Sequence, residues 1–450
     1  MKVDFTHVNN ERRKILNAII RSSFEAIDPY ESVLNSIEIE GDWLLICGNK
    51  YNLQQLHRIF LTGLGKAVVP MAAGVVEKLG GRIHSGIIIS KHQIKEWDIP
   101  NNIKLLIGSH PIPSKQSITS AKELINFVEK TNASDLIINL ISGGGSALVS
   151  QPITPITIED LGIFTKLLLE SGAKIQEINT IRKHIDEIKG GGLAKKAGST
   201  PMESLIISDV LGDDISMIAS GPTSADHTTF NNAWEIIEKY GIEGKIPESI
   251  VQTLTNGVKG KIDETLKIGD EILKSKHNHV ICSLSEGIKS AQKTARSLGF
   301  KTQVISSCVV GEAREVGKVF GTILKSIVTT DLVLPRPCII IAGGETTVTV
   351  TGKGKGGRNQ EIAFGAMTTI QGVEDCAVIA LATDGEDGPT DAAGAIVTGS
   401  TLSEAETLGL NPDLYGSKND TYAFFDQLNC LIRTGSTGTN VNDLFFLLAF

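Results

Sequence analysis

Short, continuously apolar runs recur along the chain and are separated by longer stretches with helical periodicity. A strand that is apolar on both faces must be covered on both faces, as in parallel sheets packed between helices. The pattern predicts strands at residues 58–62, 86–90, 104–107, 135–141, 205–208, 279–282, 302–306, 338–342 and 377–382. Amphipathic helices are predicted between them at 66–79, 117–130, 175–189, 286–298 and 312–327.

The alternation of strand and helix predicts the α/β class. A chain of 450 residues has room for two or three domains. Residues 240–249 mix glycine, proline and charge, which is typical of a linker. We therefore expect an N-terminal α/β domain at 1–245 and a C-terminal one at 246–450. Both should have mainly parallel sheets, and ligands should bind at the carboxyl ends of the strands, in a cleft between the domains.

Charge and composition exclude several kinds of partner. The net charge is −8 and no basic tail or stripe is present, which argues against nucleic acid and anionic membranes. No apolar run reaches the about 18 residues of a membrane span, and the first ten residues lack the core of a signal peptide. The six cysteines are far apart, so we expect buried free thiols in a cytoplasmic protein.

Two glycine-rich loops that follow apolar strands are candidate anion sites. Lys66 follows Gly63 and Gly65 at the start of a predicted helix, where backbone N–H groups are free. The helix dipole disfavours a lysine there, so an anionic ligand explains it better than a surface position does. The second loop has three glycines between two serines, which suits a phosphate cradle of backbone N–H groups better than a plain turn. It consists of Ser142, Gly143, Gly144, Gly145 and Ser146.

Carboxylates follow three further predicted strands. Asp209 comes after 205–208, Glu345 after 338–342 and Asp384 after 377–382. A carboxylate at a buried strand end can hold Mg²⁺ or accept a substrate proton, whereas the alternative for Asp209 is a helix cap.

A glycine-rich segment near Arg358 contains one GxGxxG match, at Gly352, Gly354 and Gly357. The preceding residues, 346–351, alternate polar and apolar side chains and predict a half-exposed strand. A dinucleotide-binding strand should be buried on both faces, so we interpret the segment as a mobile flap that carries Arg358 to a ligand.

Arg182 lies off the apolar stripe of the predicted helix 175–189. It could bind a ligand, or it could form an i,i+4 surface pair with Asp186. The sequence leaves both interpretations open.

Taken together and in order, these loops resemble the glycerate 2-kinase family, whose C-terminal half is called the MOFRL domain. The resemblance covers about residues 10–450 and is carried by 63–67, 108–113, 142–147, 178–191, 208–221, 343–345, 356–361, 383–388 and 437–443.

The resemblance implies a Rossmann-like N-terminal domain and phosphorylation of D-glycerate by ATP with Mg²⁺ or another divalent cation, giving 2-phosphoglycerate. It implies catalytic roles for Lys66, Arg358 and Asp209. Nucleotide contacts are expected from residues 142–146, Glu345 and Asn440, and metal contacts from Asp209, Glu345 and Asp384.

Two other functions remain as alternatives. An NAD(P)-dependent hydroxypyruvate reductase would use similar small acids, but no buried strand is followed by GxGxxG and a later acidic residue. A non-enzymatic sensor of hydroxy acids or sugar phosphates would need the anion loops without the three strand-end carboxylates. A homo-oligomeric state is left open by the sequence.

Overall fold

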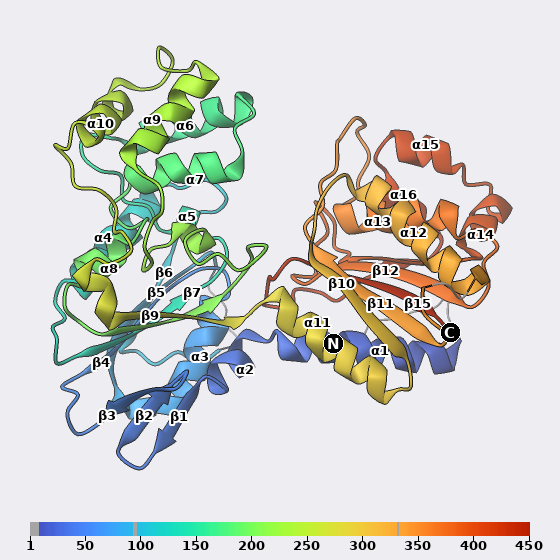
Figure 1. The fold of residues 1–450 in the computed structure, drawn as a ribbon, viewed down its shortest axis with the longest axis horizontal. Coiled ribbons are helices and arrows are strands. Elements are labelled where there is room, and N and C mark those ends of the chain that lie inside the picture. The colour runs from blue at the N-terminus through green and yellow to red at the C-terminus, as the bar shows by residue number, and fades with distance from the viewer. Residues whose placement is uncertain (1–8, 93–96, 331–332) are drawn as a thin grey trace. The chain divides into compact units, whose positions relative to one another are not determined.

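The computed structural model describes residues 9–92, 97–330 and 333–450 (Figure 1). The chain divides into two compact units. The inserted unit is the contiguous segment Pro29–Ile281, and the terminal unit joins the residues up to Asp28 with Cys282–Phe450. The predicted boundary at 245/246 does not match this division. Residues around it connect α9 (Phe230–Tyr240) to α10 (Glu248–Val258), and both helices contribute to one apolar cluster of the inserted unit.

The main sheet of the inserted unit has the strand order β6-β5-β4-β7-β8-β9. Its pairings from β6 through β8 are all parallel, which confirms the prediction made from the continuous apolar runs. The strands are β4 (Ile59–Leu64), β5 (Ile83–Ser90), β6 (Ile103–Ile107), β7 (Leu136–Ile141), β8 (Met202–Ile207) and β9 (Lys276–Cys282). The helices that accompany them are α3 (Val68–Leu79), η1 (Gly80–Arg82), α4 (Lys115–Val128), α5 (Gly145–Leu148), α8 (Gly192–Lys196), η2 (Ile218–Ser220) and η3 (Glu271–Ser275).

Two smaller parts complete the inserted unit. After α2 (Pro29–Leu34), an antiparallel three-stranded sheet is formed by β1 (Ile37–Glu40), β2 (Trp43–Ile46) and β3 (Asn49–Asn52). A helical group made of α6 (Ile158–Glu170), α7 (Ile175–His184), α9 and α10 has its own apolar core. Figure 1 shows this group above the main sheet.

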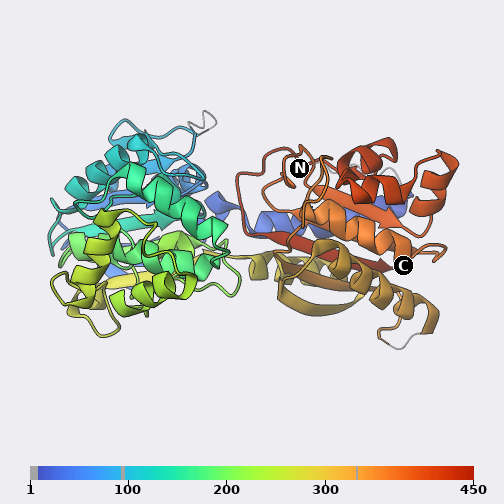
Figure 2. The same cartoon turned by 90° about the horizontal axis from the view of Figure 1, so that it is seen from above.

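The terminal unit contains a mixed sheet with the order β10-β11-β15-β12-β13-β14. Only β10 and β11 pair in parallel; the other four pairings are antiparallel. The expectation of a mainly parallel sheet is therefore wrong for this unit. Two of these pairings come from β15, the last strand of the chain, which runs between β11 and β12 and antiparallel to both (Figure 2), and the other two come from β13 with its neighbours β12 and β14. The strands are β10 (Lys301–Val309), β11 (Cys338–Gly344), β12 (Cys376–Ala382), β13 (Gly394–Thr398), β14 (Leu431–Ile432) and β15 (Asp443–Ala449).

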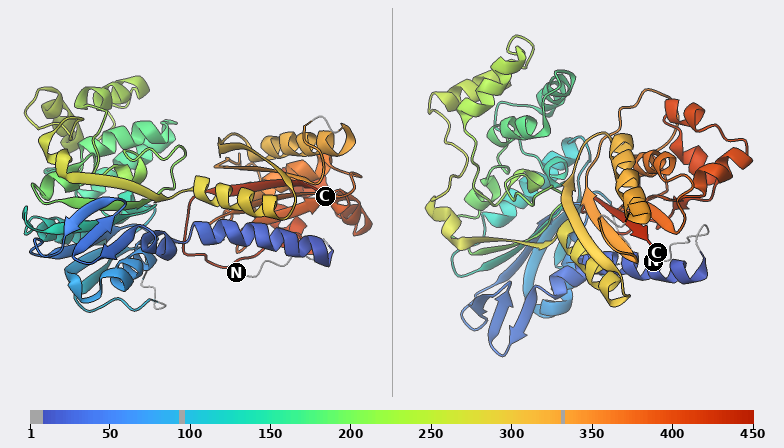
Figure 3. Two further views of the ribbon diagram at one scale, coloured as in Figure 1. Left: turned by 60° about the horizontal axis from the view of Figure 1, so that its bottom comes forward. Right: turned by 45° about the vertical axis from the view of Figure 1, so that its right-hand side comes forward.

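The helices of the terminal unit include one from the opposite end of the chain. α1 (Asn10–Ala26) lies along α11 (Leu284–Ser297), as both views of Figure 3 show. The remaining helices are α12 (Ala313–Thr330), α13 (Arg358–Thr369), α14 (Thr401–Thr407), α15 (Pro412–Ser417) and α16 (Thr421–Gln427).

All nine predicted strands and five predicted helices are present, with shifted ends. The largest shift is in α7, which ends at His184 and not at residue 189. The carboxylate of Asp186 accepts hydrogen bonds from the backbone N–H groups of Ile188 (2.9 Å) and Lys189 (3.4 Å), which competes with a further helical turn. Residues 346–351 form no strand, because their pairing is limited to one bridge between Glu312 and Thr347.

Two further expectations concern the surface. Within the described parts of the chain, no helix combines the length and apolar character needed to cross a lipid bilayer. All six cysteines are free thiols. Four of them are buried as predicted, but Cys47 and Cys308 are exposed.

Candidate functional site

The two predicted glycine loops of the inserted unit meet at the carboxyl ends of adjacent strands. β4 and β7 pair in register up to Leu64 and Ile141, so the loops that follow them start side by side. The Lys66 backbone N–H donates to the carbonyl of Gly143 (2.9 Å), and the Ala67 N–H donates to Oγ of Ser142 (3.0 Å). These bonds hold Lys66 next to the triple-glycine loop.

Asp209, at the end of the neighbouring strand β8, reaches the same place. A Cβ atom added at Gly143 would lie 2.2 Å from Oδ2 of Asp209, so only glycine allows this approach. A Cβ at Gly144 would lie 3.2 Å from Cε of Lys66. No helix begins after Asp209 until Ile218, so the helix-cap alternative is not supported. The inserted unit thus brings a lysine, a carboxylate and a glycine loop together.

His110 is a further member of this cluster and was not among the predicted site residues. Its ring Cδ2 would be 3.1 Å from a Cβ at Gly144. Burial, together with the charges of Lys66 and Lys91, lowers the pKa of His110 to about 4. The imidazole is therefore neutral at neutral pH, and Lys66 supplies the positive charge beside the loop. The signal was present in the sequence, because His110 precedes two closely spaced prolines directly after β6.

A second cluster lies in the terminal unit, around Arg358. The Arg358 guanidinium donates from Nε (2.5 Å) and Nη2 (3.0 Å) to the two carboxylate oxygens of Asp443, and from Nη1 to Glu345 (2.7 Å). The side chain of Asp443 is fully buried, whereas about half of Glu345 is exposed. Burial alone would lower the pKa of Arg358, but the two carboxylates raise it. Burial raises the pKa of Asp443 to about 7 despite the bound guanidinium.

Asp387 fixes the start of α13, the helix that begins with Arg358. Its carboxylate accepts from the backbone N–H groups of Asn359 (3.0 Å) and Gln360 (2.9 Å). Burial raises the pKa of Asp387 to about 6, and the hydrogen bonds oppose this shift. The roles of Asp387 and Asp443 were missed from the sequence, since each depends on a partner that is distant along the chain.

The predicted flap before Arg358 is wrong, because this segment is anchored. The backbone N–H groups of Thr351 (2.8 Å) and Gly352 (2.9 Å) donate to Oδ1 of Asn419, and Gly354 N–H donates to the carbonyl of Lys418 (2.8 Å). A Cβ at Gly352 or Gly354 would collide with the segment around Lys418. These glycines permit a close backbone contact, and at least two of their N–H groups are already used.

Asp384 and Asn440 lie at the same end of the terminal sheet as Glu345. Asp443 pairs with both Gly344 and Ala382, so the loops carrying Glu345 and Asp384 flank the start of β15. Asp384 accepts the Glu386 N–H (3.0 Å), and Asn440 accepts the Asn442 N–H (3.2 Å).

The candidate residues are thus divided between the two units. The inserted unit holds Lys66, the 142–146 loop and Asp209, and the terminal unit holds Glu345, Arg358, Asp384 and Asn440. Among the described residues, no group of three or more His, Cys, Asp or Glu side chains could hold a metal ion by itself.

Comparisons with known proteins cover almost the whole chain. Residues 15–255 match a family model described as a domain of unknown function, DUF4147, and residues 338–443 match the MOFRL family. The chain is 40% identical to a glycerate 2-kinase of Pyrococcus horikoshii, with 96% of each chain covered. It is 36% identical to a D-glycerate 2-kinase of Thermotoga maritima, over 96% of this chain and 97% of the relative.

A solved structure agrees with these relatives. The crystal structure of a glycerate kinase from Thermotoga maritima matches with a TM-score of 0.87 and 34% identity, over 98% of this chain and 100% of that one. One relative carries a different name: a putative hydroxypyruvate reductase of Agrobacterium vitis, 35% identical over 96% of this chain and 93% of the relative.

Proposed function

This chain belongs to the glycerate kinase family with a MOFRL domain, and from this premise we propose that it transfers the γ-phosphoryl group of ATP to the C2 hydroxyl of D-glycerate. The product is 2-phosphoglycerate. The proposed reaction takes place in the cytoplasm, whose reducing conditions suit a protein with only free thiols.

One observation supports the proposal above the others, namely the contact between Asp209 and the triple-glycine loop. A carboxylate that packs on Gly143 would repel a phosphate held by the same loop unless a cation lies between them. Lys66 lies on the adjacent Gly144 and supplies one positive charge. This combination of backbone donors, cation and carboxylate is suited to a nucleotide that arrives with a metal ion.

The candidate carboxylates also fit Mg²⁺ as the metal ion. Mg²⁺ usually takes only one or two protein carboxylates and completes its shell with water and substrate phosphates. A protein-only cluster of ligands is therefore not required. Asp209, Glu345 and Asp384 are the proposed ligands, and the ion would neutralise phosphate charge when bound.

The side chains have separate tasks in this mechanism. Phosphoryl transfer has a loose transition state, so positioning and charge stabilisation matter more than base catalysis. The 142–146 loop binds phosphate oxygens through its N–H groups, and Lys66 balances their charge. Arg358 is held rigidly by Asp443 and neutralises charge on the transferred phosphoryl group. Asp209 orients the C2 hydroxyl if it is not bound to the ion.

The reductase alternative is disfavoured by the local structure of the GxGxxG match. That motif needs free backbone N–H groups after a buried strand. Here the preceding residues form no strand, and the N–H groups of Gly352 and Gly354 donate to Asn419 and Lys418.

The test is a comparison of two reactions with the purified protein. With Mg·ATP and D-glycerate we expect ADP release and 2-phosphoglycerate, identified by phosphorus NMR. Hydroxypyruvate with NADH or NADPH should give no turnover. Cofactor oxidation at a comparable rate without ADP formation would overturn the proposal.

A further inference from the structure

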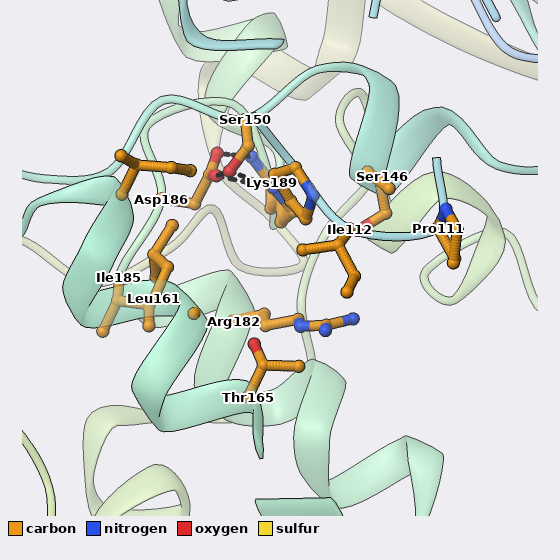
Figure 4. Close-up of a pocket in the computed structure, with 14 residues that line it drawn as sticks. Pro111, Ile112, Ser146, Ser150, Leu161, Thr165, Arg182, Ile185, Asp186 and Lys189 are labelled. Carbon is orange, nitrogen blue, oxygen red and sulfur yellow. Dashed lines mark hydrogen bonds and ion pairs between the residues drawn. The ribbon is translucent and has the colours of Figure 1, made fainter. Parts of the chain in front are cut away.

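Arg182 points into a pocket of the inserted unit that borders the glycine loop. Ile178 and Ile181 of α7, and Ile185 just after its end, pack in the apolar core of the helical group and so fix the rotation of the helix. The pocket wall includes Ser146 of the glycine loop. Figure 4 shows the Arg182 side chain running beneath Ile112 and past Thr165, away from Asp186.

The expected surface pair with Asp186 is not formed, because that carboxylate is fully used elsewhere. Its Oδ2 accepts from Nζ of Lys189 (2.5 Å), Oγ of Ser150 (2.6 Å) and the Gln151 N–H (3.1 Å). Its Oδ1 accepts the backbone N–H groups that end α7. No hydrogen bond or ion pair links Arg182 to any described residue, although Asp186 acts on it electrostatically at longer range.

This situation differs from that of the neighbouring lysine. Lys183 is buried, and its Nζ lies 3.2 Å from Oδ1 of Asp226. Burial of Arg182 lowers its pKa, and Asp186 compensates only in part. A half-buried guanidinium with no partner among the described residues is unfavourable for folding, so its presence calls for a ligand that supplies the missing negative charge.

The surroundings of Arg182 favour a small carboxylic acid over a nucleotide phosphate. Ile112 and Leu161 give the pocket apolar walls, and Thr165 adds one hydroxyl. The glycine loop beside it already offers backbone donors for phosphate. An anion held by Arg182 would thus lie next to Ser146, where an acceptor of the phosphoryl group belongs. We propose that Arg182 binds the carboxylate of the hydroxy-acid substrate and so selects acids as acceptors; this rests on the proposed function.

The test is kinetic and uses Arg182→Met. A guanidinium can form two parallel hydrogen bonds to a carboxylate, and loss of one charge-assisted bond corresponds to about tenfold or more. We expect KM for D-glycerate to rise about thirtyfold or more, with KM for ATP within about threefold of wild type. Lys166→Met, which removes an exposed cation of α6, is the matched control and should change neither value. The Tm of Arg182→Met should equal or exceed that of wild type, since no native partner is lost.

The methyl ester of D-glycerate gives a second readout. Wild type should discriminate against this uncharged ester by a factor similar to the mutational effect, whereas Arg182→Met should discriminate little. Equal KM for D-glycerate in both proteins, or an increase confined to KM for ATP, overturns the proposal while the kinase function stands. Absence of turnover with D-glycerate in wild type refutes the function instead. In that case calorimetry tests the Arg182 proposal separately, and equal affinities of wild type and Arg182→Met for D-glycerate would refute it as well.

Discussion

Arg358 has a structural role as well as its proposed catalytic one, and paired substitutions separate the two. Arg358→Met leaves the carboxylate of Asp443 buried and without its bidentate partner. Breaking a buried ion pair from one side costs about 3–5 kcal/mol. Because 30% of the Arg358 side chain is exposed, we take the lower end, about 3 kcal/mol. For a domain of about 200 residues this corresponds to a fall in Tm of roughly 6–12 °C.

The double variant Arg358→Met with Asp443→Asn also replaces the buried carboxyl group that has lost its partner. Replacing both partners of a buried pair is often close to neutral, so most of the lost Tm should return. Kinase activity should not return. Cations aimed at a transferring phosphoryl group contribute about 10³–10⁵ in rate, so both variants should lose at least about a hundredfold in kcat/KM.

The two measurements are thermal unfolding followed by circular dichroism, and ADP release at saturating ATP over a range of D-glycerate concentrations, which gives kcat/KM. Recovery of activity together with Tm in the double variant would show that Arg358 acts only through stability. An unchanged Tm in the single variant would show that Asp443 does not depend on its partner, which contradicts the geometry described above.

Two further predictions concern the glycine loop and the start of α13. Gly143→Ala should displace Asp209 and lower kcat/KM at least about tenfold, because catalytic groups tolerate only sub-ångström shifts. The control is Gly244→Ala, since a Cβ added at Gly244 meets no other atom. Equal activities of the two variants would refute the contact between Gly143 and Asp209. The raised pKa of Asp387, about 6, means that the folded state binds more protons than the unfolded state between about pH 4 and 6. Its stabilising contribution is therefore present below about pH 4 and lost as the pH rises through 6. The Tm of wild type minus that of Asp387→Asn should fall over this range, and a constant difference would contradict the shift.

Local patterns predicted all six strands of the main sheet of the inserted unit, because most of these apolar runs, those of β4, β5, β7 and β8, are buried parallel strands. The terminal sheet was harder to predict. β15 is apolar on both faces, like a parallel strand, yet it enters between β11 and β12 in the opposite direction. A strand at a central position in a sheet is buried on both faces whichever way it runs. The hydrophobicity of a strand therefore does not show whether it is parallel or antiparallel to its neighbours.

The candidate site shows the same limit. Lys66, Gly143 and Asp209 were selected because each directly follows an apolar run, and the structure brings them into contact. Asp443 opens an apolar run and was not selected, since its importance depends on Arg358, 85 positions away. The flap was expected because the glycine-rich loop follows a segment that alternates polar and apolar side chains. In this segment it serves close contact with the backbone around Lys418.

The position of α1 has a consequence for the folding of the protein during its synthesis on the ribosome. This helix packs on α11, which follows the entire inserted unit in the sequence. Domains generally fold in the order of synthesis, so the inserted unit can finish before α11 has emerged. Until then, the apolar side of α1, with Leu16, Ile19 and Ile20, has no native cover. The nascent chain therefore exposes the apolar side of α1 through most of its elongation, and we expect a chaperone to bind the chain at this helix.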